Sequence, residues 1–299
     1  MSLFAFFLVF CSIFLHAAWH LISKAQKPFL AFFLAVSLGS LITTLPFVFI
    51  SGIQLQALPA ECFLFAALGG ICGALCNAGL SLAYRNADVS LAYPMARAIP
   101  VLLTAIITMV SGLGTPLGME SVVGLPIVIA GCLMMPIQRF SEIRLSDYWN
   151  KGLLGIMIAA LGTTGYTIFD SEGMKLIHEF GNVNNIYGAC VYSFLREIFL
   201  FCALCAATFG LSGERVHFSW KLMRQYQGYV AGIIASIAYL FILIAMLNVK
   251  NVSYLQAFRQ MSLPVGMIMG ILFLHEKYYY PKILGVILIV AGLILLALL

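Results

Sequence analysis

Two arginines stand inside long apolar stretches of the sequence, where a charge is costly. Arg97 lies within AYPMARAIPV, and Arg259 lies in another apolar stretch, just before LPVGMIMGILFLHEK. A charge at the centre of a lipid-spanning helix costs about 2.5–3.5 kcal/mol on insertion scales, so it usually faces a cavity or a partner. Because a guanidinium matches a carboxylate or a phosphate, we predict that Arg97 binds an anionic group of the ligand, and that Arg259 takes part in substrate binding or gating. The alternative is a structural ion pair, for which the available acids are Asp88, Asp170 and Glu197.

Three prolines accompany these arginines. Pro94 and Pro100 bracket Arg97, and Pro264 follows Arg259. Proline frees the carbonyl group four residues earlier and bends a helix. Within a membrane such a carbonyl is tolerated where it is buried in protein or faces water. We therefore predict that these helices bend where they line a polar cavity.

Other polar and aromatic side chains recur inside the apolar stretches, several of them at the spacing of one helix face. The candidate ligand-binding residues among them are His16, Trp19, His20, Asn77, Tyr84, Tyr93, Tyr166, Tyr239 and Gln256. Aromatic rings combined with amide and guanidinium groups suit an amphipathic metabolite. Packing between helices explains each of these residues equally well when it is taken singly.

Two acidic residues, Asp170 and Glu197, also fall inside apolar stretches. They are the candidates for binding a coupling proton, and a structural ion pair is the alternative. Arg196 and Glu197 are adjacent in sequence, so they should lie about 100° apart around a helix. We therefore expect these two side chains to point in different directions.

The histidines and cysteines form no recognisable metal or catalytic site. His16 and His20 are four residues apart, but no third ligand lies nearby in sequence. Among the eight cysteines, Cys202 and Cys205 form a lone CxxC within an apolar stretch. The sequence also lacks HExxH, GxSxG and paired carboxylates at helical spacing. We therefore expect no metal, no cofactor and no enzymatic activity.

The composition identifies lipid as the solvent of these stretches. Of the 299 residues, 63% are hydrophobic and only 9% are charged, and mean hydropathy is +1.04. A soluble protein carries about 25% charged residues, whereas a membrane span needs about 20 mostly apolar ones. We predict an all-α integral membrane protein with ten transmembrane helices. The predicted spans are 3–22, 29–50, 60–84, 88–110, 119–137, 152–172, 184–209, 227–248, 252–274 and 281–298.

The chain divides into two halves that resemble each other. We predict one unit at 1–140, a connecting loop at 141–151 and a second unit at 152–299, with five helices in each unit. VVGLPIVIAGCLMM (122–135) aligns with ILGVILIVAGLILL (283–296), and two further segments align at nearly the same offset. An odd number of helices per unit inverts the second unit in the membrane, which is a common architecture of secondary transporters.

These features resemble the drug/metabolite transporter superfamily, and specifically its ten-helix EamA type. The resemblance covers essentially the whole chain, and it is carried by the paired repeats together with AYPMARAIPVLLTAI, LPVGMIMGILFLHEK and HAAWHLISK. It implies a small-molecule carrier of the cell membrane with a central cavity, often an exporter of amino acids or other metabolites.

We therefore expect a secondary transporter that works by alternating access and exports a small anionic or zwitterionic metabolite, such as an amino acid. The expected partners are this substrate and the lipid bilayer, not nucleic acid, and the protein is expected to be a monomer. The alternatives are a cationic or drug-like substrate, a non-transporting membrane receptor or scaffold, and an intramembrane enzyme. The last two are disfavoured because the sequence holds no large soluble loop and no catalytic motif.

Overall fold

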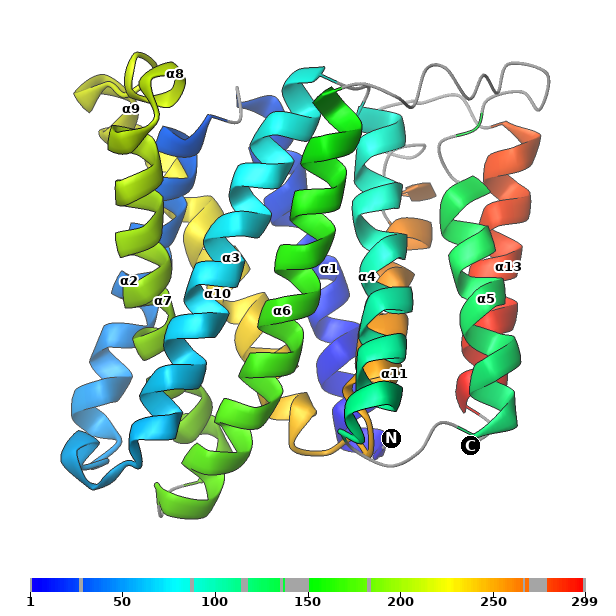
Figure 1. Cartoon of the computed structure of the whole chain (residues 1–299), viewed down its shortest axis with the longest axis horizontal. Coiled ribbons are helices and arrows are strands. Elements are labelled where there is room, and N and C mark those ends of the chain that lie inside the picture. The colour runs from blue at the N-terminus through cyan, green and yellow to red at the C-terminus, as the bar shows by residue number, and fades with distance from the viewer. Residues whose placement is uncertain are drawn as a thin grey trace.

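The fold is known from a computed structural model that describes most of the chain. The described residues are 2–26, 29–86, 89–113, 118–134, 137, 151–181, 184–265, 267–268 and 279–297. Within these ranges the regular elements are all helices, arranged as a bundle (Figure 1). The predicted all-helical membrane class is confirmed.

The long helices follow the predicted spans closely. They are α1 (Leu3–Ala25), α2 (Leu30–Ile50), α3 (Ala60–Asn86), α4 (Val89–Ser111), α5 (Met119–Met134), α6 (Lys151–Phe180), α7 (Asn185–Gly210), α10 (Tyr226–Met246) and α13 (Tyr280–Ala297). The largest difference is at α6, which continues to Phe180, well past the predicted end at residue 172. The added turns carry Lys175 and Glu179. Hydropathy marks where the lipid ends, and a helix can continue beyond that point.

Five of the described helices are long and apolar enough to cross a membrane, namely α2, α3, α6, α7 and α10. Apolar stretches of 10–17 residues lie in α1, α4, α5 and α13. The remaining predicted span, 252–274, is represented by α11 (Val252–Phe258) and the turns after it, and its last residues lie outside the described ranges. The described helices therefore account for parts of all ten predicted spans.

The short helices α8 (Ser212–Arg215) and α9 (Trp220–Met223) connect α7 to α10 and were not predicted. The buried carboxylate of Glu214 holds this connection to the start of α2 and the end of α3. It accepts a hydrogen bond from the Leu30 backbone N–H (3.1 Å) and pairs with Arg85. A four-residue helix buries too little to show a hydrophobic period, so the sequence pattern could not reveal it.

Glycines allow α3 and α6 to pack very closely at the centre of the bundle. An added Cβ at Gly79 would lie 2.6 Å from the carbonyl oxygen of Gly155, and one at Gly155 would lie 2.7 Å from that of Gly79. At Gly162, an added Cβ would lie 2.6 Å from the carbonyl oxygen of Cys72. Small residues at helix crossings are the usual device for close approach in membranes. The α3–α6 pair is thus a rigid support for side chains that point away from this contact.

The helix after α10 changes character at Arg259. The α-helix α11 ends at Phe258, and Arg259–Met261 forms a 3₁₀ turn before the buried Pro264. Pro264 cannot donate a backbone hydrogen bond to Gln260, which explains the local departure from α geometry. This 3₁₀ turn lies next to Pro264, where a bend is predicted. In contrast, α4 is helical throughout Val89–Ser111, through Pro94 and Pro100.

Most basic residues of the described part lie on helix ends and connections at one end of the bundle, and both termini lie at the opposite end (Figure 1). In the described part these are Arg85, Lys151, Arg215, Lys221, Arg224 and Lys282, whereas Lys175, near the end of α6, and Lys250, between α10 and α11, lie at the terminal end. Loops rich in lysine and arginine usually remain in the cytoplasm. We expect the basic end to face the cytoplasm and both termini to lie outside.

A reporter that is active only in the cytoplasm tests this orientation. Fused after residue 299 it should be nearly inactive, whereas the same reporter inserted between α8 and α9 should be strongly active. Strong activity of the C-terminal fusion would show that the charge count assigns the wrong orientation.

Candidate functional site

A central cavity of about 140 Å³ lies among α1, α2, α3, α4, α6, α7, α10 and the 3₁₀ turn at Arg259. The helices α5 and α13 lie side by side at one edge of the bundle and contribute no lining residue (Figure 1). A cavity of about 150 Å³ accommodates one six-membered ring such as benzene. The site therefore suits a ligand about the size of a single ring.

Arg196 of α7 is the centre of a buried charge network beside this cavity. Its Nε atom lies 2.7 Å from Asp170 Oδ2, and its Nη1 atom lies 3.6 Å from Glu197 Oε2. Asp170 is fully buried and also accepts hydrogen bonds from the hydroxyls of Tyr192 (3.0 Å) and Tyr239 (2.6 Å). Both carboxylate oxygens of Asp170 are therefore occupied by protein donors, and the residue does not itself line the cavity.

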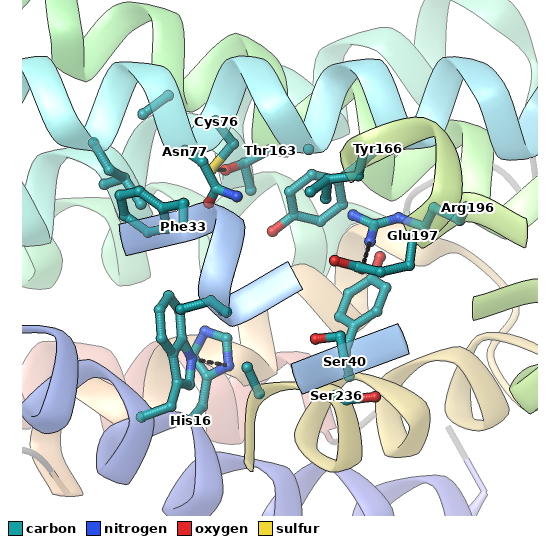
Figure 2. A pocket seen from close by; sticks show the side chains of 18 of the residues that line it. His16, Phe33, Ser40, Cys76, Asn77, Thr163, Tyr166, Arg196, Glu197 and Ser236 are labelled. Carbon is teal, nitrogen blue, oxygen red and sulfur yellow. Dashed lines mark hydrogen bonds and ion pairs between the residues drawn. The ribbon is translucent and has the colours of Figure 1, made fainter. Parts of the chain in front are cut away.

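Two tyrosine rings enclose the guanidinium of Arg196. Its central carbon lies 5.2 Å from the ring centre of Tyr166 and 4.7 Å from that of Tyr239, within the range of cation–π attraction. The two rings meet edge to face, with centres 5.8 Å apart. Figure 2 shows Tyr166 beside Arg196 and Glu197 at the cavity wall. Tyr239 thus contacts both members of the Asp170–Arg196 pair. Its hydroxyl donates to Asp170, and its ring lies against the guanidinium of Arg196.

Glu197 is the acidic residue that faces the cavity directly. Its Oε1 atom accepts a hydrogen bond from Ser37 of α2 (2.6 Å), and its other oxygen is the more distant partner of Arg196. A carboxylate with one hydroxyl donor and one loose ion pair is less completely held than Asp170. Glu197 therefore has carboxylate surface that a ligand or a proton can reach.

Arg259 approaches the cavity from the 3₁₀ turn after α11 and is 5% exposed. Its Nη1 atom donates to Gln256 Oε1 (3.1 Å), and its guanidinium lies 5.9 Å from the ring of Tyr239. The backbone oxygen of Gln256 accepts a hydrogen bond from Gln260 Nε2 (2.9 Å), which holds the Gln260 side chain against the same helix. The predicted ligand-binding residue Gln256 is not among the lining residues and instead positions Arg259.

Arg97 lies beside Arg259 at the cavity wall. Its Nη2 atom donates to the backbone oxygen of Arg259 (3.3 Å) and to the hydroxyl of Ser262. These contacts join α4 to the segment that follows α11. Arg97 therefore combines a position at the cavity with a structural connection between two helical segments.

The other walls of the cavity carry aromatic, amide and hydroxyl groups. Trp19 Nε1 donates to His16 Nδ1 (3.2 Å), and the two rings meet edge to face. Asn77 of α3 also lines the cavity, and its side-chain amide has no hydrogen-bond partner among the residues that the structure describes. The Ser236 hydroxyl is buried and likewise lacks a partner in the described ranges. Figure 2 shows His16 and Phe33 across the cavity from Arg196.

Glycines on α3 and α6 make room for the charge network. An added Cβ at Gly69 would collide with the carboxylate of Asp170, and one at Gly73 would lie 2.9 Å from Arg196 Nη2. Gly173 of α6 gives space to the ring of Tyr192 in the same way. Helix packing and side-chain placement therefore depend on the same small residues.

Many of the predicted residues converge on one cavity, although they come from distant parts of the chain. Those that line it are His16, Trp19, Asn77, Arg97, Tyr166, Glu197, Tyr239 and Arg259. The side chains of His20, Tyr84, Tyr93 and Pro94 lie outside the described part of the structure.

Sequence reasoning missed the most connected residue of the site. Arg196 and Glu197 were expected to point in different directions, but both line the cavity. That expectation was wrong because a long arginine side chain can turn back along its helix. Other lining residues that were missed are Phe33, Ser40, Thr163, Ser193 and Ser236. Single small or aromatic residues inside apolar helices give no distinguishing signal.

The described residues contain no group of three or more histidine, cysteine or acidic side chains placed to hold a metal ion. The eight cysteines are all unpaired. Cys76 lines the cavity and its sulfur lies 3.2 Å from the hydroxyl of Thr163. These residues act as small packing groups in the described helices.

The chain is similar in sequence and in structure to known proteins. A family model described as "Sugar transport protein" matches residues 23–299. A protein of Lactobacillus johnsonii described as "Putative sugar uptake protein" is 26% identical over 253 residues, which is 83% of this chain and 81% of the relative. A crystal structure of another protein aligns with a TM-score of 0.68 and 17% identity over 98% of this chain and 96% of the other. This last similarity shows the fold alone.

Proposed function

Because the chain belongs to the sugar transport protein family within the drug/metabolite transporter superfamily, we propose that it takes up a monosaccharide or a monosaccharide derivative by alternating access. As a member of this family it is a multi-pass transporter of the cell membrane and not an enzyme. The resemblance to the superfamily is confirmed. The matching family is the sugar transport family rather than the EamA type named from the motifs.

The observation that carries this proposal is the combination of unsatisfied polar groups and rings around a ring-sized space. The Asn77 amide and the Ser236 hydroxyl face the cavity without a hydrogen-bond partner among the described residues. Ser236 is buried and Asn77 is half-buried, and both groups are placed to hydrogen-bond a ligand rich in hydroxyls. Trp19 and Tyr166 offer flat faces to the apolar C–H surface of a sugar ring.

The comparisons favour uptake of a sugar over the expected export of an amino acid. The named relative is described by sugar uptake, and nothing in the comparisons supports efflux. The sequence favoured an amino acid because a guanidinium suits its carboxylate. The same guanidinium also donates hydrogen bonds to sugar hydroxyls, so charge alone did not discriminate between the two substrates.

Alternating access in this protein would use two inverted repeats, 1–140 and 152–299. The contact between α5 and α13 supports this proposal. The sequence alignment pairs Gly124 with Gly285 and Gly131 with Gly292. In the structure an added Cβ at Gly124 would lie 3.1 Å from the oxygen of Gly292, and one at Gly131 would lie 2.7 Å from that of Gly285. The Gly124–Gly292 contact in one repeat order thus corresponds to the Gly285–Gly131 contact in the other. A two-fold relation between the repeats requires such a pair of matching contacts.

Glu197 is the residue we propose for proton coupling, because it faces the cavity whereas Asp170 is held by three protein donors. Glu197→Gln should abolish uptake driven by a pH gradient and leave substrate counterflow in place. Transport of labelled substrate into proteoliposomes with and without a gradient measures both. Gradient-driven uptake that survives in Glu197→Gln would exclude this coupling site.

Uptake into intact cells tests the proposed function. Cells that lack their own sugar uptake systems and produce this protein should accumulate at least one labelled monosaccharide or monosaccharide derivative above the vector control. Release of preloaded sugar without net uptake would instead support export. A panel that includes neutral sugars, sugar acids and amino acids separates the substrate classes.

A further inference from the structure

One buried guanidinium at the cavity has no acidic partner among the residues that the structure describes. Arg259 lines the cavity and is 5% exposed. Its contacts are a neutral amide oxygen, that of Gln256, and the tyrosine rings nearby. Among the described residues, no carboxylate lies within ion-pair distance of Arg259, and the two buried acids of the site pair with Arg196.

Arg196 and Arg259 therefore differ in a way that matters for a ligand. Arg196 already has two carboxylate partners, so its charge is compensated before any ligand arrives. Buried charges are almost always paired, because removing an ion from water without compensation is strongly unfavourable. At Arg259 that compensation has to come from the cavity, either from water or from an anionic ligand that replaces it.

The segment that carries Arg259 is built to hold it in place. The side-chain oxygen of Gln256 accepts a hydrogen bond from one guanidinium nitrogen of Arg259 (3.1 Å). The backbone oxygen of Arg259 also accepts hydrogen bonds from Arg97 Nη2 and from the Ser262 hydroxyl (2.9 Å). A planar donor group held rigidly in a low-dielectric cavity suits bidentate binding of an anion.

We propose that the substrate of this transporter is a sugar acid, whose carboxylate binds Arg259 while its hydroxyls reach the Asn77 amide and the Ser236 hydroxyl. This inference rests on the proposed uptake of a sugar. One guanidinium carries one positive charge, which a carboxylate balances. A sugar phosphate would bring a charge of about −1.5 to −2 together with a bulkier group into a ring-sized space.

Matched sugars test the proposal on the purified wild-type protein. We would measure the dissociation constants of galactose, galacturonate and galactose 1-phosphate by the thermal stability that each confers. Galacturonate should bind about 10- to 100-fold more tightly than galactose, as expected for a charge-assisted hydrogen bond to a buried partner. Glucose, glucuronate and gluconate form a second matched set.

Each result has a definite meaning. Equal or tighter binding of the neutral sugars would overturn the sugar-acid inference and leave sugar uptake intact. Tighter binding of the phosphate than of the acid would overturn the assignment of a carboxylate. Binding of no sugar or sugar derivative in the panel would overturn both the inference and the proposed function.

Variants assign the effect to Arg259. Arg259→Lys keeps the charge and should weaken galacturonate binding while retaining part of the preference for the acid. Arg259→Gln should bring the affinity for galacturonate down to that for galactose. The control is Arg224→Gln, the same substitution at an exposed site, which should change neither affinity. An unchanged preference for galacturonate in folded Arg259→Lys and Arg259→Gln would overturn the role of this residue.

Discussion

Asp170→Asn is expected to remove most of the folded protein, because it leaves the buried guanidinium of Arg196 without its closest partner. Asp170 is fully buried and lies 2.7 Å from Arg196 Nε, whereas the remaining acid, Glu197, is 3.6 Å away. Breaking a buried ion pair by removing one partner costs about 3–5 kcal/mol. The yield of monodisperse protein and its melting temperature should both fall sharply.

A second substitution separates a structural pair from a coupling site. In the structural interpretation, Arg196→Gln combined with Asp170→Asn removes the unpaired charge and should restore much of the lost yield. Glu179→Gln, on an exposed part of the same helix, is the matched control and should behave like the wild type. Normal stability of Asp170→Asn together with loss of proton-driven transport would instead favour Asp170 over Glu197 in coupling.

Gly73→Leu is expected to abolish transport while the protein still folds. Gly73 lines the cavity, and an added Cβ there would lie 2.7 Å from Leu200 Cδ1 and 2.9 Å from Arg196 Nη2. Both are ends of side chains rather than backbone, so they can move aside. The larger side chain would then occupy much of a cavity of about 140 Å³. We expect uptake to fall to the level of empty vesicles.

The control for this variant is Gly210→Leu, at a position where an added Cβ meets nothing within 4 Å. It should transport like the wild type. Gly73→Ala should give an intermediate rate, since it adds a single methyl group. Wild-type rates in a folded Gly73→Leu variant would mean that the substrate does not pass through this cavity.

The helices could be predicted from the sequence because lipid imposes one simple requirement, a long apolar run for each span. The ends of α1, α2 and α7 follow the predicted limits closely. The α8 and α9 turns were not predictable, because the buried Glu214 that fixes them depends on Arg85 and on the start of α2. Contacts between segments so far apart in sequence have no local signal.

Part of the cavity could also be predicted, because a charge or an amide inside an apolar run is costly and needs a reason. Arg97, Arg259 and Asn77 were predictable for this reason. Arg196 was not predictable as a lining residue, since its direction depends on the side-chain path toward Asp170. A sugar and an amino acid could not be separated from the sequence, because the same polar groups serve both, and the family match favours a sugar.

Counterflow in proteoliposomes tests the central claim most directly, that a sugar binds in this cavity and crosses the membrane through it. Vesicles containing purified protein would be loaded with one unlabelled sugar or sugar acid and diluted into the labelled form. We predict transient, saturable accumulation of label for wild type and for Gly210→Leu, and none for Gly73→Leu. Absence of counterflow for every sugar and sugar acid, or equal counterflow in Gly73→Leu, would contradict this account.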